Sequence, residues 1–332
     1  MADTFTLEQF MRFALYHPRI GYYATRVKGI GRLADFATAP TISPLLGHAI
    51  ARWITARRRH RAFRPWNIIE IGGGDGSLAL SLWRALSLPA RAGMRYHIVE
   101  VSAPLRQAQA TRLKGRHFRW HDAMGAAIEQ CGGDAVIIAN EVVDAFPAVQ
   151  WEWCGGRWRE IGVRLGDGDP REVHLEPDVD RVLRWYPERI QCTAHPREGD
   201  RIEMQLSYAE WFASWANGLS RGAMLTIDYG APAPAPIPGG SMRAYWHHQA
   251  LRGNDIYLRP GRQDLTADVD FGALKRWGEQ HGLHTVWAGS QGDFIRQWAS
   301  DRIVGGAAVF LTNEAGAGGA FRVLEQRWGA AS

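Results

Sequence analysis

The chain has 332 residues, of which 46% are hydrophobic and 22% charged, as in soluble globular proteins, so its length predicts one elaborated domain or two joined domains. The formal net charge of +5 comes from basic residues that interleave with acidic ones, and we expect no nucleic-acid partner. The densest basic run, at 57–61, is interpreted as the solvated end of a helix that begins near Pro44.

From residue 67 onward, short apolar runs alternate with helical patterns. The expected strands are 67–71, 96–99, 117–120, 135–139 and 224–228, and the expected helices include 78–86, 104–113 and 208–219. The last two runs, "AAVFLTN" and "AFRVLEQRW", are interpreted as a terminal β-hairpin. This order predicts an α/β fold with the outline of the class I methyltransferase sheet: Rossmann-like, mostly parallel, with a terminal antiparallel hairpin and inserted substrate lobes.

Two segments interrupt the alternation and are interpreted as inserted lobes. Apolar and polar residues alternate around a Gly-Gly turn in "VQWEWCGGRWREIGVRLGDGD", which predicts a β-hairpin. The proline-rich "APAPAPIPGG" predicts a stiff, extended connector. The expected division is an N-terminal helical segment with a cofactor lid (1–66), a cofactor-binding core (67–150), a first lobe (151–204), the core continued (205–230), a second lobe (231–300) and the terminal hairpin (301–332).

Targeting and cysteine signals are weak. No apolar run reaches membrane-spanning length, and "MADTFTLEQF" resembles neither a signal peptide nor a transit peptide. Cys131, Cys154 and Cys192 are far apart in the sequence, which predicts neither a disulfide framework nor a metal site. We therefore expect a cytoplasmic protein without a membrane partner.

The glycine cluster in "NIIEIGGGDGSLALSL" predicts a nucleotide-like cofactor. Gly72 and Gly74 fit the first two positions of the dinucleotide fingerprint, but Ser77 replaces its third glycine. Asp75 would place a carboxylate where a diphosphate binds, and like charges repel. An NAD-dependent oxidoreductase is therefore disfavoured. S-adenosylmethionine, which carries an ammonium and a sulfonium group but no phosphate, fits better.

Two acidic residues follow the next two predicted strands. Glu100 could accept hydrogen bonds from both ribose hydroxyls, and Asp122 could reach the adenine amino group. Each could instead be a charge at a helix N-terminus. Their order at the ends of successive strands favours a site for S-adenosylmethionine.

The fourth predicted strand leads into "NEVVDAFP", where chemistry is expected. Glu141 and Asp144 are three residues apart and would share one face of a helical turn. Paired carboxylates suit a guanidinium acceptor, which they could orient and from which they could take a proton. Alternatively, Asn140 caps a helix and the two acids only favour its positive end.

Motifs along nearly the whole chain resemble the MidA-like methyltransferases, a family that includes the mitochondrial complex I assembly-factor arginine methyltransferase and bacterial relatives. The matching blocks include "FMRFALYHPRIGYYA", "DFATAPTISPLLG", "EIGGGDGSLA", "VEVSAPLRQAQATRL", "NEVVDAFP", "LTIDYG", "GSMRAYWHH", "PGRQDLTADVDFGAL" and "SQGDF". The resemblance implies a class I fold, S-adenosylmethionine as the methyl donor, and a guanidino nitrogen of arginine as the acceptor.

The resemblance also implies roles for residues that match the motifs. The segment 37–43, with Pro40 and Ser43, would close over the methionine end of the cofactor, and Glu141 and Asp144 would face the acceptor. The other implied site residues are Glu70, Gly72, Gly74, Glu100 and Asp122 for the cofactor, and Asp228 and Tyr229 in the acceptor cleft.

Departures from the family pattern affect the expected substrate. Ala34 stands for a glycine, Thr41 for a glutamate, and Asp268 for a histidine, so the cleft loses one carboxylate and gains another at Asp268. These changes slightly favour free arginine or another guanidino small molecule, rather than an arginine-bearing protein, as the expected acceptor. The lobes could also form a homodimer surface. A non-catalytic assembly factor is the main alternative, and the intact Glu141 and Asp144 count against it.

Overall fold

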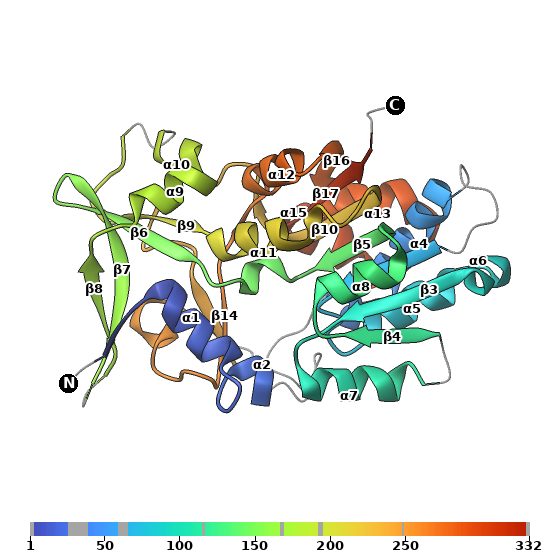
Figure 1. Ribbon diagram of the computed structural model, residues 1–332, viewed down its shortest axis with the longest axis horizontal. Helices are drawn as coiled ribbons and strands as arrows, with labels where there is room; N and C mark the ends of the chain where they lie inside the picture. The colour runs from blue at the N-terminus through green and yellow to red at the C-terminus, as the bar shows by residue number, and fades with distance from the viewer. Residues whose placement is uncertain are drawn as a thin grey trace. The chain divides into compact units, whose positions relative to one another are not determined.

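The computed structural model describes residues 3–25, 39–58, 66–114, 117–166, 169–191, 195–247 and 249–329. The chain divides into two compact units (Figure 1). The core unit comprises 27–142, 214–230 and 275–332, and the lobe unit comprises 1–26, 143–213 and 231–274. Helices α11 (Leu206–Ala216) and α12 (Phe271–Gln280) cross from the lobe segments into the core segments.

The core unit is built on a sheet with the strand order β16-β17-β10-β5-β2-β3-β4. Its strands are β2 (Trp66–Ile71), β3 (Met94–Val99), β4 (Phe118–His121), β5 (Asp134–Asn140), β10 (Arg221–Ala231), β16 (Leu283–Ser290) and β17 (Phe321–Trp328). Strands β10, β5, β2, β3 and β4 run parallel, and β17 lies antiparallel between β10 and β16. The predicted mostly parallel α/β sheet with antiparallel strands at one end is confirmed.

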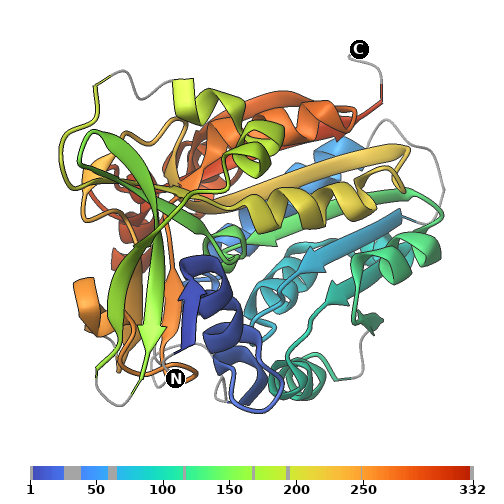
Figure 2. The same cartoon turned by 60° about the vertical axis from the view of Figure 1, so that its left-hand side comes forward.

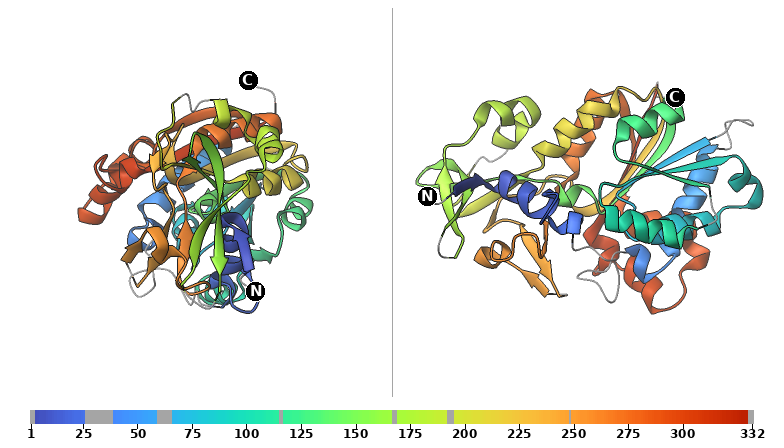
Figure 3. Two further views of the ribbon diagram at one scale, coloured as in Figure 1. Left: turned by 90° about the vertical axis from the view of Figure 1, so that its left-hand side faces the viewer. Right: turned by 60° about the horizontal axis from the view of Figure 1, so that its bottom comes forward.

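Helices cover both faces of this sheet (Figure 3). They are α3 (Ala39–Ile42), α4 (Leu45–Arg58), α5 (Ser77–Ala85), α6 (Leu88–Ala92), α7 (Ala103–Arg112), α8 (Met124–Cys131), α13 (Gln291–Ala299), η3 (Ser300–Arg302), α14 (Gly306–Thr312) and α15 (Ala317–Ala320). Helix α4 packs against α5 and α13, and its Trp53 and Ile50 are fully buried in the hydrophobic core. These contacts hold the carboxyl ends of β2, β3 and β5 in fixed positions.

The strand predicted at "AAVFLTN" is wrong, because this segment forms α14. Ala308, Leu311 and Thr312 are buried while Val309 and Phe310 are exposed, which is the spacing of one helix face. The antiparallel partner of β17 at the sheet edge is β16 instead. Exposed and buried positions nearly alternate along β16, as expected for a strand with one face on the core.

The lobe unit contains a second, mainly antiparallel sheet, whose long strands come forward in Figure 2. Its strand order is β1-β7-β6-β9-β11, and β8 also pairs with β7. The strands are β1 (Asp3–Thr6), β6 (Val149–Cys154), β7 (Arg157–Leu165), β8 (Arg171–Leu175), β9 (Asp200–Met204) and β11 (Ile237–Pro238). Strands β6 and β7 form the predicted hairpin, with positive φ angles of 60° and 78° at Gly155 and Gly156 in its turn.

The lobe unit also contains helices and short strands outside this sheet. Helix α1 (Leu7–Tyr16) begins with a capping box in which the Thr6 hydroxyl accepts from the Gln9 amide, and it buries one apolar face. The others are α2 (Tyr22–Thr25), η1 (Val143–Ala145), α9 (Val179–Trp185), α10 (Pro187–Gln191), β12 (Arg243–Trp246), β13 (Gln249–Leu251), η2 (Gly253–Ile256), β14 (Asp264–Thr266) and β15 (Val269–Asp270). Within the described ranges, no helix is both long and apolar enough to cross a bilayer.

Candidate active site

The glycine loop after β2 has the backbone conformation that the sequence predicted for a close approach to a ligand. Gly72, Gly74 and Gly76 have φ angles of 62°, 53° and 83°, which L-residues rarely adopt. At Gly73, an added Cβ would lie 2.8 Å from the Ile98 Cγ2 atom. An L-residue at Gly72, Gly74 or Gly76 would therefore be strained, and a side chain at Gly73 would collide with Ile98.

Glu100 lies directly after β3, as predicted, and is tied to the glycine loop. Its side chain accepts hydrogen bonds from the Ser102 amide at 2.9 Å and from the Gln109 Nε2 atom at 3.0 Å. The same Gln109 amide donates to the Gly74 carbonyl at 2.8 Å. Gln109 is fully buried and fixes Glu100 relative to the loop. The sequence analysis did not identify Gln109, because an amide within a helix carries no motif of its own.

Glu70 places a buried carboxyl group on β2, just before the glycine loop. It is 2% exposed on β2 and accepts a hydrogen bond from the Tyr96 hydroxyl at 2.7 Å. Burial raises the pKa of Glu70 to about 8, and repulsion from Glu100 and Asp75 adds to the effect, although the Tyr96 hydrogen bond opposes it. Burial also raises the pKa of Glu100. A cation near these carboxylates would relieve their repulsion.

We expect Glu70→Gln to remove a pH dependence of stability. The folded-state pKa of about 8 exceeds the unfolded value of about 4.3, so the folded protein binds more protons between these values. Stability from Glu70 is therefore fully present below about pH 4 and is lost as the pH rises toward 8, with a slope of at most about 1.4 kcal/mol per pH unit. Urea unfolding from pH 5 to 8.5 should show a smaller decline for Glu70→Gln than for wild type or for the exposed control Glu129→Gln. Equal declines in all three proteins would contradict the assignment.

Asp75 and Asp122 have protein partners of their own. Asp75 Oδ1 accepts from the Ser77 amide at 2.9 Å, and its Oδ2 atom lies 2.9 Å from an Arg112 guanidinium nitrogen. Asp122 is 87% exposed at its side chain and forms an ion pair with Arg106. The charge of Asp75 is thus balanced within the protein, which weakens the argument that it selects a cationic ligand. The cofactor roles of both residues stay predictions.

Asn140 is the last residue of β5, where it pairs with Ile227 of β10, and Glu141 follows it directly. The Glu141 amide donates to the Ile227 carbonyl at 2.9 Å, and the Glu141 Oε1 atom accepts from the Ala39 amide and the Asn140 Nδ2 atom, each at 3.2 Å. The buried Asn140 Oδ1 atom has no hydrogen-bond partner among the described residues. An unpartnered acceptor of this kind is costly unless a ligand or water donates to it.

Asp228 lies at the same edge of the core sheet. It is fully buried, and its carboxylate accepts from the Val142 amide at 3.2 Å and from the Tyr229 amide at 2.9 Å. The Tyr229 ring packs edge-on against Phe321, with centroids 5.2 Å apart. The core unit thus brings Asn140, Glu141 and Asp228 together at the ends of two neighbouring strands, β5 and β10.

The helical turn expected to align Glu141 with Asp144 does not form. Glu141 has a φ of 54°, in the left-handed region, and only Val143–Ala145 forms a short 3₁₀ turn. Glu141 and Asp144 therefore do not share a helix face, and Asn140 does not cap a helix. The left-handed Glu141 is also strained, as residues at functional sites often are.

Asp144 belongs to an aromatic and acidic cluster within the lobe unit. The Tyr23 hydroxyl donates to Asp264 at 2.8 Å, and the rings of Tyr16 and Tyr23 stack with centroids 5.5 Å apart. Burial raises the pKa of Tyr23, and Asp264, Tyr16 and Asp144 raise it further. The Asp144 carbonyl accepts from the Ala267 amide at 3.1 Å. Sequence reasoning missed Tyr23 and Asp264, which are distant from Asp144 in the chain.

Asp268 does not supply a free carboxylate. It forms an ion pair with Arg243 at 2.6 Å, and its amide donates to the Ser241 hydroxyl at 3.0 Å. Arg243 is largely buried, so the pair balances a charge inside the lobe unit. The predicted contact of Asp268 with substrate gains no support from this arrangement.

The predicted lid is described only in part. Pro40 lies in α3, and the Ser43 hydroxyl accepts from the Leu45 amide at 3.2 Å, beside the start of α4. Residues 26–38, including Ala34, lie outside the described residues. The expected closure over the methionine end of the cofactor stays a prediction.

Residues 45–289 match the family described as "Putative S-adenosyl-L-methionine-dependent methyltransferase". The chain belongs to this methyltransferase family. The match covers most of the chain, including the glycine loop, Glu100, Asn140 and Asp228. It confirms the MidA-like resemblance, the class I fold and S-adenosylmethionine as the methyl donor, and it leaves no support for an NAD-dependent oxidoreductase.

Curated relatives of this methyltransferase carry a more specific name. The Drosophila melanogaster relative, "Protein arginine methyltransferase NDUFAF7 homolog, mitochondrial", is 27% identical over 319 residues, which cover 87% of this chain and 70% of the relative. The human "Protein arginine methyltransferase NDUFAF7, mitochondrial" is 25% identical and matches 82% of this chain and 65% of its own length. The chain therefore spans about two thirds of these relatives.

A solved structure shares the whole fold. A "likely methyl transferase" from Burkholderia thailandensis, bound to S-adenosyl-homocysteine, is 26% identical to this methyltransferase with a TM-score of 0.85. The superposition covers 99% of this chain and 89% of the other. The similarity includes both units, so the lobe unit is shared with that protein.

The names of the curated relatives show that the expected cytoplasmic localisation is wrong. The curated relatives from fly, frog and human are all named as mitochondrial proteins.

The core-unit residues fit the methyl donor. S-adenosylmethionine carries two positive charges, and the buried carboxylates Glu70 and Glu100 have pKa values raised by burial, so they gain from a nearby cation. The glycine loop has no Cβ atoms at the positions that a ligand would approach. The unpartnered Asn140 Oδ1 atom is an acceptor for an ammonium or amide N–H.

Proposed function

We propose that this methyltransferase methylates a guanidino nitrogen of arginine. The observation that carries the proposal is the pair of carboxylates at the carboxyl end of β5: Glu141 follows this strand directly, and the buried Asp228 on the neighbouring β10 accepts a hydrogen bond from the Val142 amide. Carboxylates bind the planar fork of guanidinium donors in a bidentate manner. The names of the curated relatives support the same acceptor chemistry.

The proposed reaction must remove a proton from a strongly basic group. The bound donor supplies an electrophilic methyl group attached to a sulfonium. A guanidinium has a pKa above about 12, so the attacked nitrogen must lose a proton as the new bond forms. The Glu141 carboxylate would hold the charge on the nitrogens that are not attacked and accept this proton, while the Asn140 Oδ1 atom would accept an N–H and orient the group.

We propose that the arginine is borne by a protein. The preference for free arginine rested on several departures from the family pattern. One of them, the additional carboxylate at Asp268, is paired with Arg243 and therefore carries less weight. The named protein arginine methyltransferase activity of the relatives supports the protein acceptor.

The experiment is a direct competition between acceptors. The enzyme is incubated with isotopically labelled S-adenosylmethionine and either free arginine or protein extract, and the products are hydrolysed and examined by mass spectrometry. We expect labelled methylarginine from protein and little from free arginine. Label in free arginine alone would overturn the protein acceptor but not the guanidino chemistry, whereas label only in other residues would overturn both.

A further inference from the structure

Three side chains with metal-binding atoms meet in the lobe sheet and have no part in the proposed reaction. Glu152 and Cys154 are two residues apart on β6, and they therefore face the same side of the sheet. His174 lies on β8, and both strands pair with β7. One ligand atom from each residue lies within 4.8 Å of the other two, and His174 Nε2 is 3.3 Å from Glu152 Oε1.

A further carboxylate, that of Glu198, interacts with the Cys154 side chain. Both Glu198 carboxylate oxygens also lie 3.1 Å from the Gly155 amide nitrogen, which fixes the carboxylate beside the hairpin turn. The cluster thus offers one sulfur, one imidazole nitrogen and two carboxylates.

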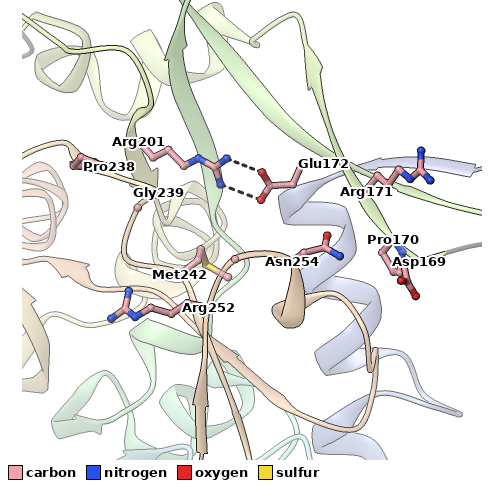
Figure 4. Close-up of a pocket in the computed structure, with 12 residues that line it drawn as sticks. Asp169, Pro170, Arg171, Glu172, Arg201, Pro238, Gly239, Met242, Arg252 and Asn254 are labelled. Carbon is pink, nitrogen blue, oxygen red and sulfur yellow. Dashed lines mark hydrogen bonds and ion pairs between the residues drawn. The ribbon is translucent and has the colours of Figure 1, made fainter.

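The charge around the cluster leaves it net negative. Arg201 contacts Glu152, but it also forms a two-bond pair with Glu172, at 2.6 and 2.9 Å (Figure 4). Arg159 forms an ion pair with Glu176. Arg201 and Arg159 therefore each have a carboxylate partner outside the cluster, and Glu152 and Glu198 remain to balance a cation.

Arg201 and Glu172 also line a pocket in the lobe unit. The pocket has a volume of about 700 Å³ and includes Met242, Arg252 and Asn254 (Figure 4). In the figure, the Arg201 guanidinium and the Glu172 carboxylate point toward each other. Arg201 would therefore keep a carboxylate partner if Glu152 turned to a cation.

We propose that Glu152, Cys154, His174 and Glu198 bind one zinc-class divalent cation. Zinc takes four nitrogen, sulfur and oxygen ligands at about 2.0 to 2.3 Å, which places the ligand atoms roughly 3.3 to 3.8 Å apart. The ligand atoms of Glu152, Cys154 and His174 need a contraction of about 1 Å, which rotations of these side chains can supply. The Glu198 carboxylate lies outside this group of three and must rotate toward it as well. The thiol proton leaves to solvent on binding, and no electron is transferred. The ion would tie β6 to β8 across β7.

The test uses the whole chain, freed of metal by chelation, and cobalt(II) as a visible probe. We expect one equivalent of cobalt to give the absorption of a tetrahedral site with a thiolate charge-transfer band, and zinc to displace it. Cys154→Ser should remove the charge-transfer band. His174→Gln should weaken binding by more than about 100-fold, beyond the 10- to 100-fold typical of changes in outer-shell partners.

The controls separate binding from folding. His284→Gln removes an exposed histidine in the core unit, and Cys131→Ala removes the buried thiol there, so both should bind cobalt as wild type does. Melting temperatures without metal should match between wild type and His174→Gln, because His174 is exposed, and zinc should raise only that of wild type. A cobalt spectrum without the thiolate band, or unchanged affinity in His174→Gln, would overturn the site.

Discussion

Glu141→Gln is expected to reduce methyl transfer by about two orders of magnitude or more while cofactor affinity stays nearly unchanged. The amide keeps an oxygen that can accept from the Ala39 amide and the Asn140 Nδ2 atom, so the local structure should persist. It loses the negative charge that pairs with a guanidinium and the basic oxygen that takes its proton. Steady-state rates with an arginine acceptor, together with calorimetric titration of S-adenosylhomocysteine, measure the two effects separately.

Glu129→Gln is the matched control, because it makes the same chemical change at an exposed position on α8 of the same unit. It should retain wild-type rates. If Glu141→Gln kept wild-type turnover, the carboxylate would have no part in charge pairing or proton transfer. If both its turnover and its cofactor binding fell together, Glu141 would support the cofactor site instead.

The parts of the fold that follow from local patterns could be predicted. Strand β2 could be predicted because a short apolar run ends in glycines. The β6–β7 hairpin could be predicted because apolar and polar residues alternate on both sides of a Gly-Gly turn. The run that forms α14 was misassigned because a short apolar segment suits either a strand or a buried helix. The strand that pairs with β17 in its place is β16, which lies before α14 in the chain.

The sequence predicted which residues lie at the candidate site better than it predicted how their side chains are arranged. The glycine loop and Glu100 lie at the expected strand ends, because the polarity of a parallel sheet places those ends together. The pairing of Asp268 with Arg243 could not be read from the sequence, since it depends on contacts between segments that are separated in the chain. Likewise, the left-handed Glu141 contradicts the helix that the spacing of acids suggested.

Gly74→Val is expected to abolish cofactor binding in a protein that still folds. At a φ of 53° a branched residue is strained, and its side chain would add bulk to the loop that we propose contacts the methyl donor. Gly132→Val separates the two effects, because Gly132 has a φ of 61° but an added Cβ there meets no atom within 4 Å. Both variants should lose a similar stability, on the order of 1 to 2 kcal/mol for the left-handed backbone. Only Gly74→Val should fail to bind S-adenosylhomocysteine in calorimetry, and tight binding by that variant would show that the loop after β2 does not contact the donor.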